Sequence, residues 1–242
     1  MKILAIETAT MLGGIALLDD SAGLIAEIRL NVKSTHSERL MTGVDYILKQ
    51  SSLTISDIDF FALSIGPGSF TGLRIGLSTA KGLSYATGKP VVTVPTLEAL
   101  ALNFPYCKYP VCTMLDARKN EVYAALFRWD GDGFKRLLHE SAMPVSKLAE
   151  TIMHYIDDKV MLTGEGTLLY RDKITKYFGE RALFASPDKT APSPANSAIL
   201  GIRKALNGEF SELRSLVPFY IRKSEAELKK DVRNKTSKNA ST

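Results

Sequence analysis

The chain has 242 residues, of which 45% are hydrophobic and 24% charged, and its formal net charge is +5. Such a composition is typical of a globular protein with enough apolar residues for one large core or two smaller ones. Two cysteines and three scattered histidines argue against a disulfide framework and a zinc site, and the lack of a signal peptide or of roughly 18 consecutive apolar residues predicts a cytoplasmic protein.

The first half of the chain predicts a mixed sheet flanked by helices. Residues 2–7, 15–18 and 23–32 have the apolar and β-branched character of strands, which indicates a three-strand meander. Residues 37–51 show helical spacing after a capping-box pattern of Thr35 and Glu38. Strands are then predicted at 60–65 and 91–94, with a helix between them that ends near Gly88 and another that begins near Thr96. The order β-β-β-α-β-α-β is that of a mixed sheet with helices.

A lobe boundary is predicted at the stretch N-F-P-Y-C-K-Y-P, where two prolines break the pattern. We therefore expect an N-terminal lobe at residues 1–106 and a C-terminal lobe at residues 107–225. In the second lobe, residues 111–116 and 122–129 predict a hairpin across A-R-K-N-E, and helices and strands alternate at 146–155, 159–163, 168–178 and 195–206. Apart from strand-rich starts in both halves, no repeat is evident.

The end of the chain is basic. From Arg222 onward there are seven basic and three acidic residues, so the preceding part is nearly neutral. Residues 226–242 have few apolar side chains to bury, and we expect a disordered tail there. The tail could contact nucleic acid through its charge, or it could be a solvated segment with no dedicated role.

Residues 64–76, S-I-G-P-G-S-F-T-G-L-R-I-G, raise the question of a phosphate-binding loop. The glycine spacing does not fit the dinucleotide fingerprint, no Gly-Lys-Ser/Thr ends the run as in a Walker A loop, and the glycines around Ser69 do not form a nucleophile elbow. The loop supplies a flexible strand exit and two hydroxyls, Ser69 and Thr71, either of which can cap the next helix. It is first a structural device.

The predicted helix after this loop carries small residues at four-residue steps: Gly72, Gly76, Ala80 and Ser84. With Gly82, three interior glycines each cost roughly 1 kcal/mol relative to alanine, so close packing should offset that cost. Two explanations remain open: packing against the protein's own first helix, and packing against a partner subunit.

Two further candidates for chemistry are weaker. The turn E-T-A-T-M-L-G-G offers the hydroxyls of Thr8 and Thr10 to a phosphate, although an ordinary hairpin is the favoured interpretation because hairpin turns are so common. Asp116, at the end of the second lobe's first strand, is the best-placed single acid. Alone it supports no acid–base assignment.

The motifs I-G-P-G-S-F-T-G-L-R-I-G and D-A-R-K-N-E-V-Y resemble those of the bacterial TsaB family of tRNA threonylcarbamoyladenosine biosynthesis proteins. The likeness covers most of the chain and includes L-A-I-E-T-A-T, H-S-E-R-L, P-T-L-E-A-L and P-F-Y-I-R. It implies a two-lobed α/β fold of the actin-like, Hsp70-like ATPase (ASKHA) class, in which each lobe is a mixed sheet with a three-strand meander flanked by helices.

The resemblance also implies a role. It is that of a non-catalytic scaffold subunit required for threonylcarbamoyladenosine formation at position 37 of tRNAs that read codons beginning with A. Such a subunit pairs with the catalytic subunit TsaD, is joined by the ATPase TsaE, meets tRNA through the complex, and forms a homodimer when TsaD is absent. ATP and magnesium are used by the complex, and none is assigned to this subunit.

TsaD carries a V-N-H-x-E-G-H motif whose two histidines bind the metal. In this sequence the equivalent segment is V-P-T-L-E-A-L, where Thr96 and Leu100 replace both histidines. A hydroxyl and an isobutyl group cannot hold the metal that two imidazoles would. Glu7 is a second departure, because many relatives have Asp there; Glu keeps the charge but moves it one methylene farther from the backbone, which argues against an inherited nucleotide contact.

The resemblance implies a partner interface on the helices that start near Ser37 and Gly72. The expected contacts are Ser37, Leu40, Val44, Gly72, Leu73, Gly76, Leu77 and Ala80, so that Gly76→Leu should abolish pairing and leave the fold intact. Possible nucleotide contacts are Glu7, Thr8 and Thr10. Two alternatives stay open: a self-sufficient ATPase or kinase-like transferase that holds a magnesium-nucleotide between these residues and Asp116, and a tRNA-binding module that uses the tail.

Overall fold

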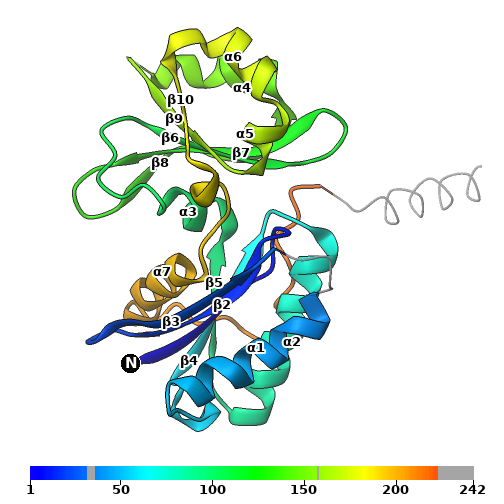
Figure 1. Cartoon of the computed structure of the whole chain (residues 1–242), viewed down its shortest axis with the longest axis vertical. Helices are drawn as coiled ribbons and strands as arrows, with labels where there is room; N and C mark the ends of the chain where they lie inside the picture. Colours follow the sequence, from blue (N-terminus) through cyan, green and yellow to red (C-terminus); the bar gives the residue numbers. More distant parts are fainter. Residues whose placement is uncertain (32–35, 157, 223–242) are drawn as a thin grey trace, which may run out of the picture.

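The computed structural model describes residues 1–31, 36–156 and 158–222. The first lobe, at the bottom of Figure 1, is built on a five-stranded sheet. Its elements are β1 (Lys2–Glu7), β2 (Gly13–Asp19), β3 (Gly23–Leu30), α1 (His36–Gln50), the 3-10 helix η1 (Ile55–Asp57), β4 (Phe60–Gly66), α2 (Phe70–Thr87), β5 (Val91–Pro95) and, after the second lobe, α7 (Pro194–Leu206). The helix α3 (Thr96–Ala101) lies between the lobes.

The second lobe has a five-stranded sheet of its own. Its elements are β6 (Val111–Asp116), β7 (Glu121–Trp129), β8 (Phe134–Pro144), α4 (Val145–Ile152), η2 (Met153–Tyr155), β9 (Val160–Thr163), α5 (Glu165–Leu169), α6 (Arg171–Phe178), η3 (Gly179–Arg181), β10 (Ala182–Phe184) and η4 (Pro187–Lys189). The hairpin expected across A-R-K-N-E is confirmed as β6 and β7. No helix among the described residues is long and apolar enough to cross a membrane.

The two sheets share one topology. Their strand orders are β3-β2-β1-β4-β5 and β8-β7-β6-β9-β10, each an antiparallel meander followed by two parallel strands. The sequence did not show this repeat because β8 and β10 were missed. Strand β8, F-K-R-L-L-H-E-S-A-M-P, does not alternate cleanly between apolar and polar residues, and β10 has only three residues.

Both faces of the first sheet are buried. Leu4 and Ile6 of β1 belong to a core with α1 and α2, whereas Ile3 and Ala5 face α7. Side chains alternate between the two faces of a strand. Because both faces of β1 are covered by helices, its residues 3–6 are all apolar. Figure 1 shows α7 on one side of this sheet and α1 and α2 on the other.

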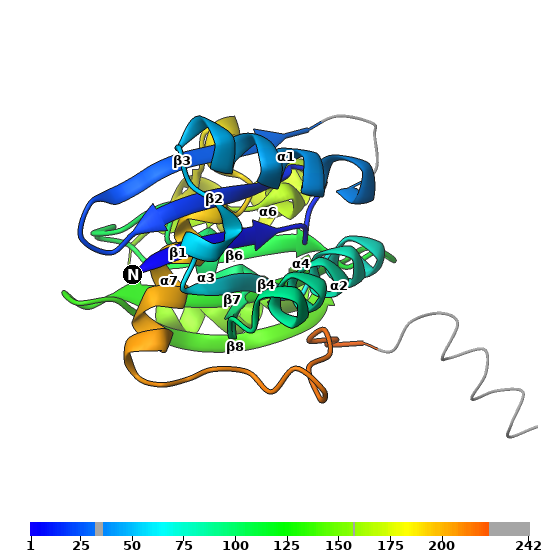
Figure 2. The same cartoon turned by 90° about the horizontal axis from the view of Figure 1, so that it is seen from below.

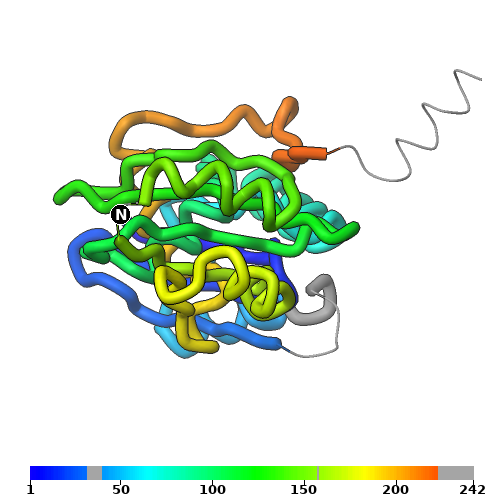
Figure 3. The backbone as a smooth tube through the Cα atoms, turned by 90° about the horizontal axis from the view of Figure 1, so that it is seen from above, coloured from blue at the N-terminus to red at the C-terminus, as the bar shows by residue number. Residues whose placement is uncertain are grey.

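The C-terminal part of the chain returns to the first lobe. Helix α7 contacts β1, β2, β4 and β5, and the following segment bonds to the first sheet through Ser211 N–H to Val91 O and Phe219 N–H to Ile65 O, both 2.8 Å. Figures 2 and 3 show this segment, in orange, crossing the molecule from α7. The expected C-terminal lobe of residues 107–225 therefore needs correction, because residues 194–219 complete the first lobe. The predicted tail, 226–242, lies outside the described residues.

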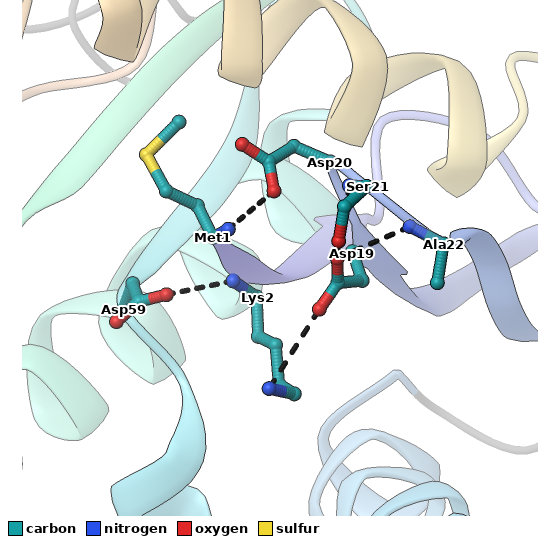
Figure 4. Close-up of polar contacts among 7 residues, drawn as sticks. All are labelled: Met1, Lys2, Asp19, Asp20, Ser21, Ala22 and Asp59. Carbon is teal, nitrogen blue, oxygen red and sulfur yellow. Dashed lines mark hydrogen bonds and ion pairs between the residues drawn. The ribbon is translucent and has the colours of Figure 1, made fainter.

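Polar contacts fix the start of β1 (Figure 4). The N-terminal ammonium pairs with Asp20, and the Lys2 N–H donates to Asp59 Oδ2 at 2.7 Å. Asp19 accepts from Ser21 and from the Ala22 N–H. These contacts anchor β1 to β2 and to the loop before β4, so that the other end of β1, at Glu7, is held at the junction of the lobes.

Helix α3 joins the two lobes. Its Leu97, Leu100 and Ala101 share an apolar cluster with residues of β6 and β7. Glu98 also accepts a 2.8 Å hydrogen bond from Arg136 of β8, in the same lobe. Toward the first lobe, Ala99 of α3 shares a cluster with Leu200 of α7. The lobes are thus packed against each other through this short helix and not only tethered by loops.

Candidate functional site

A cleft of about 940 Å³ lies between the lobes. The first lobe contributes the β1–β2 turn and the glycine loop, and the second contributes the β6–β7 turn and α5. Tyr220 and Arg222, from the end of the described chain, also line it. The volume falls in the range of small-molecule sites, so we tested each expected ligand-binding residue against this cleft.

The glycine loop enters α2 beside the cleft. Of the two hydroxyls that could cap this helix, Ser69 does so: its Oγ accepts from the Gly72 N–H at 3.3 Å. The Ser69 N–H in turn donates to the Ala9 carbonyl oxygen at 2.7 Å. The loop is therefore bonded to the β1–β2 turn.

The small residues of α2 are explained by the same turn. A β-carbon at Gly72 would collide with the Thr8 carbonyl oxygen, and one at Gly76 with the Thr8 hydroxyl. The close neighbour is thus the end of β1, which differs from both explanations left open by the sequence, the first helix and a partner subunit. Gly82 is different, since a β-carbon there would meet nothing within 4 Å.

This packing corrects the expected partner interface. Seven of its residues are buried within the first lobe: Leu40, Val44, Gly72, Leu73, Gly76, Leu77 and Ala80. Ser37 lies in α1, and its side chain is outside the described part of the structure. The apolar positions at helical spacing are those that face the lobe's own core, so a partner could reach only the opposite sides of α1 and α2.

Glu7 is fully buried and internally satisfied. Its carboxylate accepts from the Ala9 N–H at 2.7 Å and from the Ser64 hydroxyl, which lies 3.0 Å from the Ser197 hydroxyl of α7. Burial raises the pKa of Glu7 to about 7, and the hydrogen bonds from Ser64 and Ala9 oppose that shift. The carboxylate joins β1, β4 and α7 and does not face the cleft.

Thr8 and Thr10 are also poor nucleotide ligands. Thr8 is fully buried, with its hydroxyl against Gly76, and Thr10 donates to the Leu12 carbonyl oxygen at 3.1 Å. The Ala9 N–H, which could have bound a phosphate, is taken by Glu7. The possible nucleotide site at Glu7, Thr8 and Thr10 stays a prediction: Thr10 lines the cleft, whereas Glu7 and Thr8 are fully buried beside it.

The second-lobe wall of the cleft is ionic. Asp116 Oδ1 accepts from the Arg118 N–H at 2.9 Å and from the Tyr170 hydroxyl at 3.1 Å, and Oδ2 lies 3.3 Å from the Arg118 guanidinium. Burial, followed by the charge of Asp116, raises the pKa of Glu165 and of Tyr123. Asp116 thus lines the cleft as expected, but its charge holds the β6–β7 turn and opposes ionisation of its neighbours.

The last described residues close one side of the cleft. The Tyr220 ring stacks on Phe70 with centroids 5.1 Å apart, and its hydroxyl accepts from Arg74 Nε at 3.0 Å. Arg222 then forms an ion pair with Glu121 of the second lobe. Sequence reasoning assigned no role to these side chains, and the only signal was the motif P-F-Y-I-R.

The segment equivalent to the TsaD metal motif forms the end of β5 and α3. The Thr96 hydroxyl accepts from the Gly66 N–H at 3.2 Å, and Leu100 is buried in the cluster between the lobes. Within the described part of the chain, no three His, Cys, Asp or Glu side chains gather in a way that could hold a metal ion.

Comparison with known proteins agrees with this architecture. Residues 24–230 match the family described as "TsaD: tRNA N6-adenosine threonylcarbamoyltransferase". The tRNA threonylcarbamoyladenosine biosynthesis protein TsaB of Bacillus subtilis is 31% identical over 95% of this chain and 97% of the relative.

Two solved structures add support for the fold. YeaZ from Pseudomonas aeruginosa has a TM-score of 0.78 at 24% identity and covers 90% of this chain and 99% of its own. A putative N-acetylmannosamine kinase from Listeria monocytogenes has a TM-score of 0.50 at 9% identity, over 86% of this chain and 100% of its own. The expected fold class, a two-lobed actin-like α/β fold, is confirmed. By its sequence match along most of its length, the chain belongs to the TsaB proteins of the TsaD family.

Proposed function

We propose that this chain is a non-catalytic subunit in the formation of threonylcarbamoyladenosine at position 37 of tRNAs that read codons beginning with A. It pairs with TsaD, TsaE joins the pair, and tRNA is bound by the complex. The similarity to the B. subtilis TsaB, which spans nearly all of both chains, supports this role.

The observation that supports a non-catalytic role is that Thr96 and Leu100 are buried and make structural contacts. In TsaD the corresponding histidines bind a metal. Here Thr96 is fully buried and holds the glycine loop, and Leu100 is fully buried between the lobes. Neither side chain is free to bind a metal, and both stabilise the arrangement of the lobes.

ATP and magnesium belong, in this proposal, to the rest of the complex. The first-lobe groups that would hold a magnesium-nucleotide are buried and bonded within the chain, as Glu7 and Ala9 illustrate. The volume of the cleft between the lobes is the observation that favours the alternative, a self-sufficient ATPase or kinase-like transferase. Magnesium-dependent ATP turnover by the isolated chain would decide for that alternative.

The partner surface that the structure leaves available is the outer side of α1 and α2. Met41, Tyr46 and Tyr85 are exposed there, and Tyr85 is 90% exposed. Gly82 on the same side of α2 costs helix stability, and no contact among the described residues explains it, whereas a partner backbone that packs closely would. We therefore move the proposed contact with TsaD from the buried face of these helices to Met41, Tyr46, Gly82 and Tyr85.

The test is light scattering after size exclusion on the chain alone, with TsaD of the same organism, and with two variants. Gly82→Leu adds bulk to the proposed surface, and Thr175→Leu adds it to an exposed position of α6 in the second lobe. We expect a one-to-one complex that Gly82→Leu abolishes and Thr175→Leu preserves. The chain alone reports whether a homodimer forms when TsaD is absent. If the wild-type chain forms no complex with TsaD, the proposed function is refuted.

A further inference from the structure

Four cations surround the β6–β7 turn at the mouth of the cleft. Arg118 and Lys119 belong to the turn, and Lys173 of α6 lies 3.5 Å from Asn120 through its Nζ. Arg222 reaches the same place from the first lobe through its ion pair with Glu121. We call these four residues the basic rim.

Two neighbouring carboxylates, Asp116 and Glu121, are more buried than the cations they pair with. The Asp116 side chain is 13% exposed and its partner Arg118 is 88% exposed. Glu121 is likewise more buried than its partner Arg222, at 23% against 36%. These two acids hold Arg118 and Arg222 in place. At the turn the charged side chains that meet the solvent are Arg118 and Lys119, both positive, and Asp172 of α6 is an exposed acid next to Lys173.

The backbone of the turn is strained. Arg118, Lys119 and Asn120 have φ angles of 62°, 53° and 61°, three successive residues in the left-handed region. For residues other than glycine this conformation costs roughly 1–2 kcal/mol each, although asparagine tolerates it better. Backbone strain of this kind concentrates at functional sites.

The charge continues beyond the rim. The 20 residues that follow Arg222 contain six basic and three acidic side chains. Because the proposed function brings tRNA to the complex, and on that basis, we infer that the basic rim binds the phosphate backbone of the tRNA. Arginine and lysine on phosphates release counterions, so such binding is salt-dependent and insensitive to base sequence.

The test compares two variants that each remove two positive charges. Arg118→Asn with Lys119→Asn changes the rim, and asparagine is chosen because it tolerates the left-handed turn. Lys108→Asn with Lys135→Asn is the control, since both lysines are exposed. Lys135 of β8 lies opposite Arg128 in the backbone register of β7 and β8, toward the end of β7 that is far from the β6–β7 turn. Lys173→Gln is a third variant, which leaves the turn untouched. Binding of a tRNA transcript is measured by fluorescence polarisation at several salt concentrations, for the chain alone and for its complex with TsaD.

We expect the rim double variant to bind tRNA about tenfold more weakly or worse, with the slope of log K against log salt reduced in magnitude by about 2. Lys173→Gln, which removes one charge, should reduce that slope by about 1. The control should change affinity less than about twofold. Unchanged binding by both rim variants, or equal losses in rim and control, would overturn the inference. Light scattering separates this inference from the proposed function. If only the inference about the basic rim is wrong, the one-to-one complex with TsaD still forms; if the proposed function is wrong, no complex forms.

Discussion

Gly72 lies so close to Thr8 that the first atom of any side chain at this position would strike the Thr8 carbonyl oxygen. That oxygen belongs to backbone at the end of β1, which cannot rotate away as a flexible side chain could. The start of α2 is therefore seated directly on the first strand. The glycine loop serves this contact.

Alanine substitutions in α2 should separate this packing from ordinary helix propensity. We expect Gly72→Ala to destabilise the protein by about 1–3 kcal/mol or more, because the added carbon is forced into backbone. Gly82→Ala should stabilise it by up to about 1 kcal/mol, because that position is open. Urea denaturation measures both, and a similar loss in the two variants would contradict the assignment.

The same contact changes what Gly76→Leu would do. The sequence suggested that this variant would lose its partner and keep its fold. Since Gly76 faces the Thr8 hydroxyl and the Leu63 side chain, leucine there should lower the melting temperature of the isolated chain. A normally folded Gly76→Leu protein, by circular dichroism and thermal melting, would show that α2 can move off β1.

Thr96 should matter for stability and not for metal binding. Thr96→Val keeps the shape and leaves the buried Gly66 N–H without its acceptor, which typically costs about 1–3 kcal/mol. Thr96→Ser, which retains a hydroxyl, is the matched control and should lose less. Thermal or urea unfolding of both variants is the measurement, and equal stability of Thr96→Val and wild type would show that this hydrogen bond contributes nothing.

Much of the fold could be predicted because each strand of the first lobe is a distinct apolar run between turns. The periodicity of residues 37–51 identified α1, which the structure places at His36–Gln50. It could not show that α7 leaves the second lobe, because that depends on tertiary contacts such as Ala198 with the first sheet. The spacing of apolar residues along a helix shows that one face is apolar, but it does not show which sheet that face packs against.

The site was less predictable for a related reason. Glycine spacing in α2 correctly indicated a close approach, and the approaching group, Thr8, is separated from Gly76 by most of the lobe's sequence. Glu7 was a possible nucleotide contact only through the family resemblance, and Ser64 and Ser197 converge on it only in the folded chain. Arg118 and Arg222 gave no local signal, since charged residues are common on solvated surfaces.

Glu7 should make stability depend on pH. Burial raises its pKa to about 7, above the roughly 4.3 of an exposed glutamate, so the folded state binds this proton more tightly than the unfolded state. The contribution is therefore fully present below about pH 4 and is lost as pH rises through 7. Glu7→Gln should gain stability relative to wild type as pH increases from about 5 to about 8. Asp45→Asn, at an exposed acid of α1, is the control, and parallel pH profiles for wild type and Glu7→Gln would refute the assignment.

Glu27 should hold the returning C-terminal segment. Its carboxylate accepts from the Ser193 hydroxyl and from the Ala195 N–H at 3.2 Å, at the start of α7. A negative charge at a helix N-terminus is favourable by about 0.3–1 kcal/mol, and charge-assisted hydrogen bonds add to it. We expect Glu27→Gln to cost about 1 kcal/mol and Glu27→Ala more, because alanine also removes both hydrogen bonds. Hydrogen exchange should show the loss in α7 and in the strands it covers, with the second-lobe sheet unaffected. Uniform loss of protection in both lobes would mean that α7 does not unfold separately from the rest of the protein, and no loss in α7 would mean that Glu27 is not what anchors it.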